Sequence, residues 1–391
     1  MAARPGRPEL ADIVRAHGLD LGHLPPHHRR VLDAIGDCRT AALGGHVLAC
    51  DRCGHREISY NSCRDRHCPK CQALDRVRWQ EARAEDLLPV PYFHLVFTIP
   101  AALHPLFRQD LRLTYDLLFR AVAETLATVA ADPAHLGARL GFTTILHTWT
   151  QTLLYHPHLH VIVPGGGLDP RMTRWIPARR GFFLPVRVLS AVFRGKLLAF
   201  LEAACAQGRL PAPSGTSVAR LLRRAARKKW VVYSKPPFAG PEGALTYLGR
   251  YTHRIAFSNE RLLALEDGQV RFRFRDRAHG NVGRTMTLPA LDFLRRFLLH
   301  VLPPGFVRIR HYGLFANSVR RERLDLCRTL LGVRPGTADP TPTESWDELL
   351  LRLTGRDVTR CPQCRKGRLC VVEDFPPGVV MHLPEPCAAS P

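Results

Sequence analysis

The sequence lacks any long apolar run and any segment typical of a secretion signal. Its N-terminus is rich in proline and arginine, whereas a signal peptide needs an apolar core. No stretch reaches the roughly 20 apolar residues of a membrane-spanning helix. These absences argue against a secreted or membrane-embedded protein, and we expect a soluble protein of the cytoplasm.

Acidic residues are few for a chain of this length. The 391 residues include 56 Lys and Arg against 34 Asp and Glu, which gives a formal net charge of +22 and a pI near 10.2. Such an excess suits a polyanion such as nucleic acid better than a neutral metabolite. Only six of the basic residues are lysine. Arginine can bind phosphate through two contacts, which lysine cannot. A GC-rich genome also raises the arginine content, however, so the inference of a nucleic-acid partner depends on the net charge and not on the ratio of arginine to lysine.

Disulfides are not expected in a reducing compartment, so the twelve cysteines are interpreted first as metal ligands. Two Cys-x-x-Cys pairs, Cys50 with Cys53 and Cys68 with Cys71, are separated by fourteen residues. Each pair can present two thiolates to the same ion. The spacing predicts one tetrahedral, structural Zn²⁺ held by all four.

Other residues could extend this metal chemistry. Cys63 and His67 could replace a ligand or help to hold a second ion, and Cys38 lies upstream; the alternative for both cysteines is a buried thiol. In the tail, Cys361, Cys364 and Cys370 could hold a second zinc together with His382 or Cys387.

Basic residues surround the second Cys-x-x-Cys pair. They suggest a surface that faces nucleic acid, or otherwise a solvated charged face, and they are Arg64, Arg66, Lys70, Arg76 and Arg78.

Strands and helices in mixed order predict an α+β fold. We expect a helical lead-in and zinc-binding domain over residues 1–90, a catalytic domain over 91–335, and a linker with a cysteine-rich tail over 336–391.

Local patterns predict several elements of this fold. A strand is expected over 92–98 and helices over 105–131, 186–206 and 244–254. Two paired strands are expected over 142–154 and 158–163, with residues 155–157 as the connection. Over 269–275, two phenylalanines alternate with arginines and could stack on bases, although core packing is the preferred interpretation.

The motif His158-x-His160 opens one of these strands. Residues i and i+2 of a strand point to one face, so both imidazoles can bind one cation. Gln151, on the neighbouring strand, is the predicted third ligand, and His147 and His156 are weaker candidates. Two imidazoles and one oxygen leave positions for phosphate and water, which suits catalytic Mg²⁺ or Mn²⁺. By itself, a His-x-His pair is more often two packed histidines.

A second motif contains Tyr247 and Tyr251, four residues apart and therefore on one face of the expected helix. Tyrosines at this spacing usually pack in a core, but Arg250, His253 and Arg254 make this a poor core helix. A tyrosyl oxygen near a metal-polarised phosphate is a competent nucleophile. Arg250 and Arg254 are the predicted phosphate-binding residues, because they could stabilise the charge of the transition state.

These motifs together resemble those of the rolling-circle insertion-sequence transposases of the HUH nuclease superfamily, specifically the insertion-sequence family numbered ninety-one and its ISCR relatives. The resemblance runs from about residue 10 to 335. The segments that carry it are 60–71, 147–151, 156–160, 247–254 and 310–316.

The resemblance implies a transposable-element enzyme, a metal-dependent tyrosine DNA nickase and strand transferase, with a zinc-binding domain followed by an HUH nuclease core on a central antiparallel sheet with flanking helices. His158 and His160 would bind the metal. Tyr247 and Tyr251 would attack DNA and leave a 5′-phosphotyrosine and a free 3′-hydroxyl, although some relatives rely on one tyrosine.

Its DNA would be the single strands at the transposon ends and the target. The sequence has no Gly-x-x-x-x-Gly-Lys loop, so unwinding would come from a host helicase or the replication machinery. We therefore expect a nucleoid-associated enzyme of a bacterial cell.

Three alternatives remain open. A plasmid replication initiator or relaxase would use the same chemistry on another substrate. A non-catalytic, zinc-stapled DNA-binding regulator would not need the tyrosines. A metallohydrolase built on His-x-His would release free ends without a covalent adduct.

Overall fold

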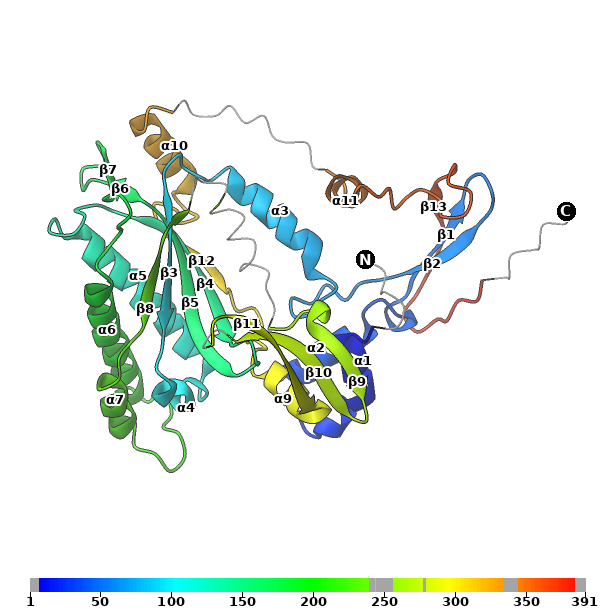
Figure 1. Cartoon of the computed structure of the whole chain (residues 1–391), viewed down its shortest axis with the longest axis horizontal. Helices are drawn as coiled ribbons and strands as arrows, with labels where there is room; N and C mark the ends of the chain where they lie inside the picture. Colours follow the sequence, from blue (N-terminus) through cyan, green and yellow to red (C-terminus); the bar gives the residue numbers. More distant parts are fainter. Residues whose placement is uncertain (1–6, 239–242, 244–255, 277–278, 334–343, 384–391) are drawn as a thin grey trace. The chain divides into compact units, whose positions relative to one another are not determined.

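The computed structural model describes residues 7–238, 243, 256–276, 279–333 and 344–383 (Figure 1). The expected helix over 244–254 lies outside these residues. Among the described helices, none is long and apolar enough to cross a bilayer.

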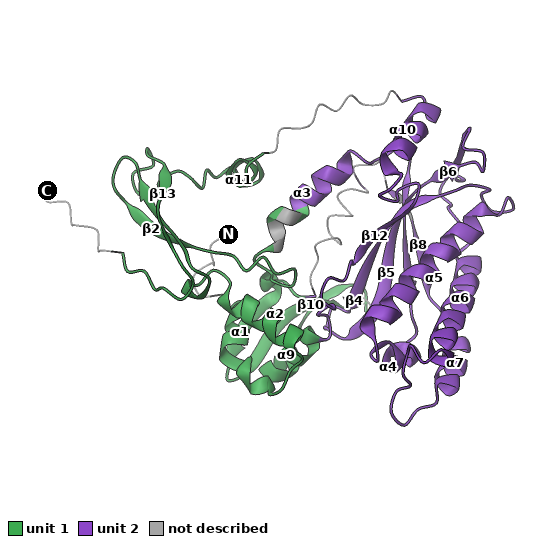
Figure 2. Cartoon of the chain, turned by 180° about the vertical axis from the view of Figure 1, so that it is seen from behind, with its two compact units in different colours: residues 1–76, 257–298, 337–391 green, residues 77–256, 299–336 purple. Residues whose placement is uncertain are grey.

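The chain divides into two compact units (Figure 2). Unit 1 comprises residues 1–76, 257–298 and 337–391, and unit 2 comprises residues 77–256 and 299–336.

These units do not coincide with the division at residues 90 and 335 that was expected from the sequence. The last of its three segments pairs a strand with the first, and the side chain of Asn259 in the middle segment accepts a hydrogen bond from the Leu10 amide at 3.1 Å. The expected tail thus belongs to the same unit as the N-terminal cysteines.

Unit 2 is built on a five-stranded sheet in the order β12-β4-β5-β3-β8, and each neighbouring pair is antiparallel. Its strands are β3 (Tyr92–Thr98), β4 (Gly141–Trp149), β5 (Tyr155–Pro164), β8 (Val232–Phe238) and β12 (Ile309–Gly313). A small hairpin consists of β6 (Gly166–Leu168) and β7 (Trp175–Pro177). The helices are α3 (Gln72–Ala84), which spans the boundary between the units, α4 (His104–Phe107), α5 (Leu111–Ala131), α6 (Val186–Ala206), α7 (Val218–Ala226) and α10 (Arg320–Leu330), with a 3₁₀ turn at Ala101–Leu103.

The central sheet presents chemically different faces. Leu159, Val161 and Val163 of β5 point to one face and join the main apolar core with residues of α5 and α6. The alternate residues, His158, His160 and Ile162, point to the other face. The sheet therefore displays histidines from a strand whose other side is fixed in the core.

Several predicted elements of unit 2 are confirmed. The predicted strand over 92–98 is β3, and the predicted helix over 186–206 is α6. The helix expected over 105–131 is instead divided into α4 and α5. The break falls before Asp110, whose carboxylate accepts a hydrogen bond from the Leu113 amide at 2.9 Å and caps the start of α5.

Unit 1 contains two small three-stranded antiparallel sheets, in the orders β13-β1-β2 and β11-β10-β9. Their strands are β1 (Gly45–Cys50), β2 (Arg56–Tyr60), β9 (Leu262–Glu266), β10 (Gln269–Asp276), β11 (Val282–Pro289) and β13 (Leu369–Phe375). The helices are α1 (Leu10–His17), α2 (Pro26–Asp37), α9 (Ala290–Leu298) and α11 (Trp346–Thr354), with 3₁₀ turns at Leu19–Leu21, Ala41–Leu43 and Asn259–Arg261.

The prediction that the phenylalanines of residues 269–275 pack in the core is confirmed for Phe272 of β10. Phe272 is fully buried and makes edge-to-face contacts with Phe257 and Phe293. Since its ring is enclosed by other rings, Phe272 is a core residue and not a platform for bases.

Candidate functional site

Three histidines from adjacent strands meet in unit 2. His147 on β4 lies directly opposite His158 on β5, and His160 follows two residues later on the same face. One ring nitrogen from each residue lies within 4.8 Å of the others. The ring centroids are 4.5 Å apart for His147 and His160 and 4.9 Å apart for His158 and His160. This histidine group has the geometry to bind one cation.

Hydrogen bonds orient two of these rings. His158 Nδ1 lies 2.7 Å from the carbonyl oxygen of His156, so Nδ1 carries the proton and Nε2 can present a lone pair. His160 Nδ1 lies 2.8 Å from Nε2 of His94 on β3. A cation on Nε2 of His160 would require the proton on Nδ1, donated to His94. Partners of this kind fix the tautomer and the orientation of metal-binding histidines.

His94 was not among the residues expected from the sequence. It is 1% exposed, and its ring stacks on that of His160 at 5.0 Å. Burial, reinforced by the charges of Lys235 and His158, lowers the pKa of His94 to about 3. His94 is therefore neutral at neutral pH, and its Nε2 can accept a hydrogen bond from Nδ1 of His160. The signal for it was a histidine inside the otherwise apolar strand of residues 92–97.

The turn between β4 and β5 differs from the prediction. Residues 155–157 were expected to connect the strands, but the connection is 150–154 and residues 155–157 belong to β5. The Thr150 side chain closes this turn by accepting a hydrogen bond from the Leu154 amide at 3.0 Å. Pro157 is accommodated where the strand register shifts, a position at which a missing amide proton is tolerated.

This turn also contains Gln151, the predicted third ligand, and its role remains a prediction. His147, the weaker candidate, is the residue whose imidazole joins His158 and His160. His156 contributes its carbonyl oxygen, which accepts the hydrogen bond from His158.

A buried histidine, His300, makes hydrogen bonds to the turn between β4 and β5. His300 donates a hydrogen bond from Nε2 to the Leu153 carbonyl at 3.0 Å, and its Nδ1 lies 3.2 Å from the Thr148 hydroxyl. Burial lowers the pKa of His300 to about 4, so this residue is a neutral structural histidine.

The predicted nucleophiles Tyr247 and Tyr251 lie outside the described residues, as do Arg250 and Arg254. Their roles remain predictions.

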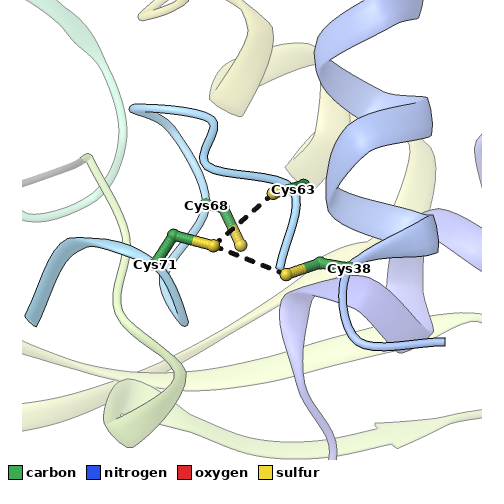
Figure 3. A group of neighbouring side chains, drawn as sticks. All are labelled: Cys38, Cys63, Cys68 and Cys71. Atoms are coloured by element: carbon green, nitrogen blue, oxygen red, sulfur yellow. Dashed lines mark hydrogen bonds between the residues drawn. The ribbon is translucent and has the colours of Figure 1, made fainter. Parts of the chain in front are cut away.

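Four cysteines of unit 1 form a first sulfur group (Figure 3). Cys38 follows α2, and Cys63, Cys68 and Cys71 come from the loop before α3. The sulfur atoms of Cys38 and Cys71 are 3.5 Å apart, and those of Cys63 and Cys71 are 3.6 Å apart. A Zn–S bond of about 2.3 Å gives a tetrahedral edge of roughly 3.8 Å, so the group fits a zinc ion.

This grouping corrects the expected ligand set. Cys68 and Cys71 do not share a site with Cys50 and Cys53, which gather elsewhere in unit 1 with two C-terminal cysteines. Cys38 and Cys63, left open between ligand and buried thiol, complete the first group instead.

Two neighbouring residues have structural partners. His67 is not a member of the sulfur group, and its Nδ1 lies 2.9 Å from the carboxylate of Asp65. Lys70, counted with the basic surface, forms an ion pair with Glu9 at 2.6 Å. Lys70 therefore ties α1 to the cysteine loop.

Two protein families match this chain. Residues 10–99 match the family described as "Transposase zinc-binding domain", and residues 141–323 match the family described as "Putative transposase". The matches occur in the order that the motifs predicted.

Known proteins are similar over almost the whole chain. The putative transposase y4qJ of Sinorhizobium fredii is 51% identical over 385 residues, which cover 95% of this chain and 96% of that protein. The transposase for insertion sequence element IS801 of Pseudomonas savastanoi pv. phaseolicola is 28% identical over 370 residues, which cover 89% and 84%.

Among solved structures, a metal-bound complex of the conjugative relaxase TrwC with oriT DNA is 17% identical, with a TM-score of 0.24, over 42% of this chain and 71% of that chain. A score this low supports no argument. The near full-length similarity to y4qJ and both family matches confirm the predicted resemblance. The chain belongs to the IS91 family of insertion-sequence transposases and carries that family's zinc-binding domain toward its N-terminus.

Proposed function

We propose that this transposase cleaves and rejoins single-stranded DNA at the ends of its element through a 5′-phosphotyrosine intermediate, in rolling-circle transposition. The observation that carries the proposal is the group of His147, His158 and His160. Three protein ligands leave at least one position for a phosphate oxygen or water, which is the arrangement of a catalytic metal site. His158 is only half-buried, so the group borders solvent.

A divalent ion held there would polarise the scissile phosphate as a Lewis acid. The phenol of Tyr247 or Tyr251 loses its proton as its oxygen attacks phosphorus, a P–O bond to tyrosine forms, and the bond from phosphorus to the 3′-oxygen breaks. That oxygen takes up a proton and leaves as a 3′-hydroxyl. Attack by a 3′-hydroxyl on the phosphotyrosine reverses these changes and joins the strands.

The chain is long enough to bring a tyrosine to the histidines. β8 ends at Phe238, opposite Tyr92 of β3, and His160 pairs with Val96 four residues along β3. Phe238 and His160 are thus about 10 Å apart across the sheet and about 13 Å apart along it. The nine residues from Phe238 to Tyr247 can span up to about 30 Å, which exceeds this separation.

The imidazole of His147, as a third nitrogen ligand, affects which ion the histidine group prefers. Two imidazoles and an amide oxygen would suit Mg²⁺ or Mn²⁺ about equally. Three imidazoles are softer ligands and favour Mn²⁺ over Mg²⁺. We expect catalysis to be faster with Mn²⁺, while the cysteine groups retain Zn²⁺.

The partner that we propose is single-stranded DNA at the element ends and at the target, with unwinding by a host helicase or the replication machinery. The net charge of +22 supports a polyanionic partner. Binding should weaken steeply with salt, because contacts between arginine and phosphate release counterions.

The test is covalent capture of DNA. Purified full-length protein is incubated with single-stranded oligonucleotides from both ends of its own element, with Mn²⁺ or Mg²⁺, and resolved on a denaturing gel. Wild-type protein should give a metal-dependent adduct. Tyr247→Phe and Tyr251→Phe variants should show which tyrosine carries it, and His158→Ala should abolish it.

Matched controls are available in the same chain. Tyr233→Phe alters a tyrosine on β8 that is 51% exposed, and His279→Ala removes an exposed histidine of unit 1; both should retain the adduct. Cleavage without an adduct would replace the proposal with a metallohydrolase. Salt-sensitive binding without cleavage would favour the regulator, and an adduct formed only on a plasmid origin would favour an initiator or relaxase.

A further inference from the structure

A second group of four cysteines joins parts of the chain that are far apart in sequence. Cys50 and Cys53 meet Cys361 and Cys364, with all four sulfur atoms within 4.8 Å of one another. The Cys50–Cys364 and Cys53–Cys361 sulfur distances are both 3.7 Å. This separation matches the edge of a zinc–thiolate tetrahedron, about 3.8 Å for Zn–S bonds near 2.3 Å. It is far longer than a disulfide bond of about 2.05 Å.

Backbone amides point at the sulfur atoms. The Arg52 amide donates to Cys50 Sγ at 3.4 Å, and the Gly367 amide donates to Cys364 Sγ at 3.3 Å. Each turn thus fixes the position of its sulfur atom with a main-chain donor, so the ligands are held in place by the local backbone.

The two turns are also joined directly by two hydrogen bonds. The Asp51 amide donates to the Arg368 carbonyl at 3.0 Å, and the Arg368 amide donates to the Asp51 carboxylate at 2.8 Å. A Cβ at Gly367 would lie 2.4 Å from Cys50 Sγ, a distance that side-chain atoms do not adopt. Glycine at 367 is therefore required for the close approach of the two pairs.

An antiparallel sheet extends the junction beyond the cysteines. β13 pairs antiparallel with β1 from Cys50 opposite Leu369 to Gly45 opposite Phe375. Phe375 is buried and packs edge-on against Tyr60 of β2, with ring centroids 6.1 Å apart. The C-terminal segment thus completes a sheet that begins in the N-terminal part of the chain.

We infer that Cys50, Cys53, Cys361 and Cys364 form a second structural zinc site, which fastens the C-terminal segment to the N-terminal zinc-binding module. Sulfur fills all four positions, so the site stabilises the fold and performs no chemistry. The family match over residues 10–99 contains only half of these ligands. The inference does not depend on the proposed tyrosine chemistry.

The experiment counts thiolate-bound zinc in the purified full-length chain, as zinc released by a mercurial reagent that displaces metal from sulfur. Histidine-bound metal does not respond to this reagent. Wild-type protein should release two zinc ions per chain. The Cys361→Ser/Cys364→Ser variant should release one, and so should the Cys63→Ser/Cys68→Ser variant, which disrupts the first group.

Two further variants distinguish the loss of a zinc ligand from a general failure to fold. Cys370→Ser removes an exposed cysteine of β13 that belongs to neither group and should keep two zinc ions. Cys364→His replaces one ligand by another that zinc accepts and should also keep two. One zinc ion in the wild type, two in the Cys361→Ser/Cys364→Ser variant, or a zinc-free wild type whose intact mass shows disulfides would each overturn the inference.

Discussion

The cysteine groups of unit 1 and the histidine group of unit 2 gather metal ligands in opposite ways. Each cysteine group takes its four ligands from turns, loops and, for Cys50, the end of a strand, and sulfur fills the tetrahedron. The histidine group takes three ligands from two paired strands and leaves the coordination incomplete. Ligands from loops can close around an ion and hold the chain together, whereas ligands on a sheet stay fixed while a substrate occupies the vacant position.

The same difference appears in what surrounds the ligands. Backbone amides two or three residues away donate to the sulfur atoms of Cys50 and Cys364, so these ligands are held by their own turns. The rings of His158 and His160 instead meet hydrogen-bond partners through Nδ1, which sets their orientation. The first environment suits permanent binding of zinc, and the second would suit accurate placement of the ion that we propose for unit 2.

The largest effect should come from the first sulfur group. Cys68 is fully buried, and Cys68→Ser should remove much of a zinc-binding free energy on the order of 10 kcal/mol. Zinc content should fall and thermal unfolding should begin at a lower temperature, while Mn²⁺ binding by the histidine group persists. Cys205→Ser, on α6 and outside both groups, is the control. Loss of Mn²⁺ binding in the Cys68 variant would show that the two kinds of site are not independent.

The second prediction concerns the third ligand of the histidine group. His147→Ala should reduce adduct formation about 10³-fold, roughly 4 kcal/mol, because a metal ligand contributes several kcal/mol to the transition state. Gln151→Ala should cost less than about tenfold if Gln151 does not coordinate the ion. Single-turnover assays with Mn²⁺ would measure both rates, and the reverse order would restore Gln151 as the ligand.

A smaller effect is expected from His94, which contacts a ligand and not the ion itself. His94→Ala removes the partner of His160 Nδ1 and should weaken Mn²⁺ binding about 10- to 100-fold, as is typical for such partners. His94→Gln keeps an acceptor and should recover part of the loss. Calorimetric titration with Mn²⁺ would measure the affinities. If both variants bind like the wild type, His94 is a packing residue only.

The smallest effect concerns pH. His300 has a pKa lowered to about 4 by burial, so between about pH 4 and 6.5 the unfolded chain binds more protons than the folded chain. Stability therefore rises with pH across this window, and His300 should account for about 2 kcal/mol of destabilisation at about pH 5.

Urea denaturation near neutral pH and near pH 5 would test this. His300→Gln should show a smaller loss of stability between the two conditions than the wild type, whereas His279→Gln, at an exposed site, should match the wild type. Equal pH dependence in all three proteins would contradict the assignment.

Regular periodicity made parts of the fold and the site predictable. Helix α6 was predicted because Leu189, Phe193, Leu197 and Leu201 recur at helical spacing, and all four are buried. The convergence of His158 and His160 follows from the period of a strand. His147, the third imidazole, was harder to identify, because its position opposite His158 depends on the register of the two strands. That register depends on where the turn lies, and Pro157 had suggested a turn at residues 155–157.

The division of the cysteines could not be predicted. Both Cys-x-x-Cys pairs near the N-terminus have the same internal spacing, and nothing local tells which partner each pair meets. Cys50 and its partner Cys364 are 314 residues apart, and only the pairing of β13 with β1 brings them together. Similarly, no local pattern marked His94 as the partner of His160, since the two belong to different strands.

The pairing of β13 with β1 has a consequence for how the protein is made. During translation β1, β2 and the first two cysteines of the second group appear early, but their sheet partner is encoded more than 300 residues later. The N-terminal module is thus begun first and completed only after all of unit 2 has been synthesised, whereas N-terminal domains usually finish folding first. A messenger cut short after the region that encodes unit 2 would yield a chain whose first domain remains unfinished.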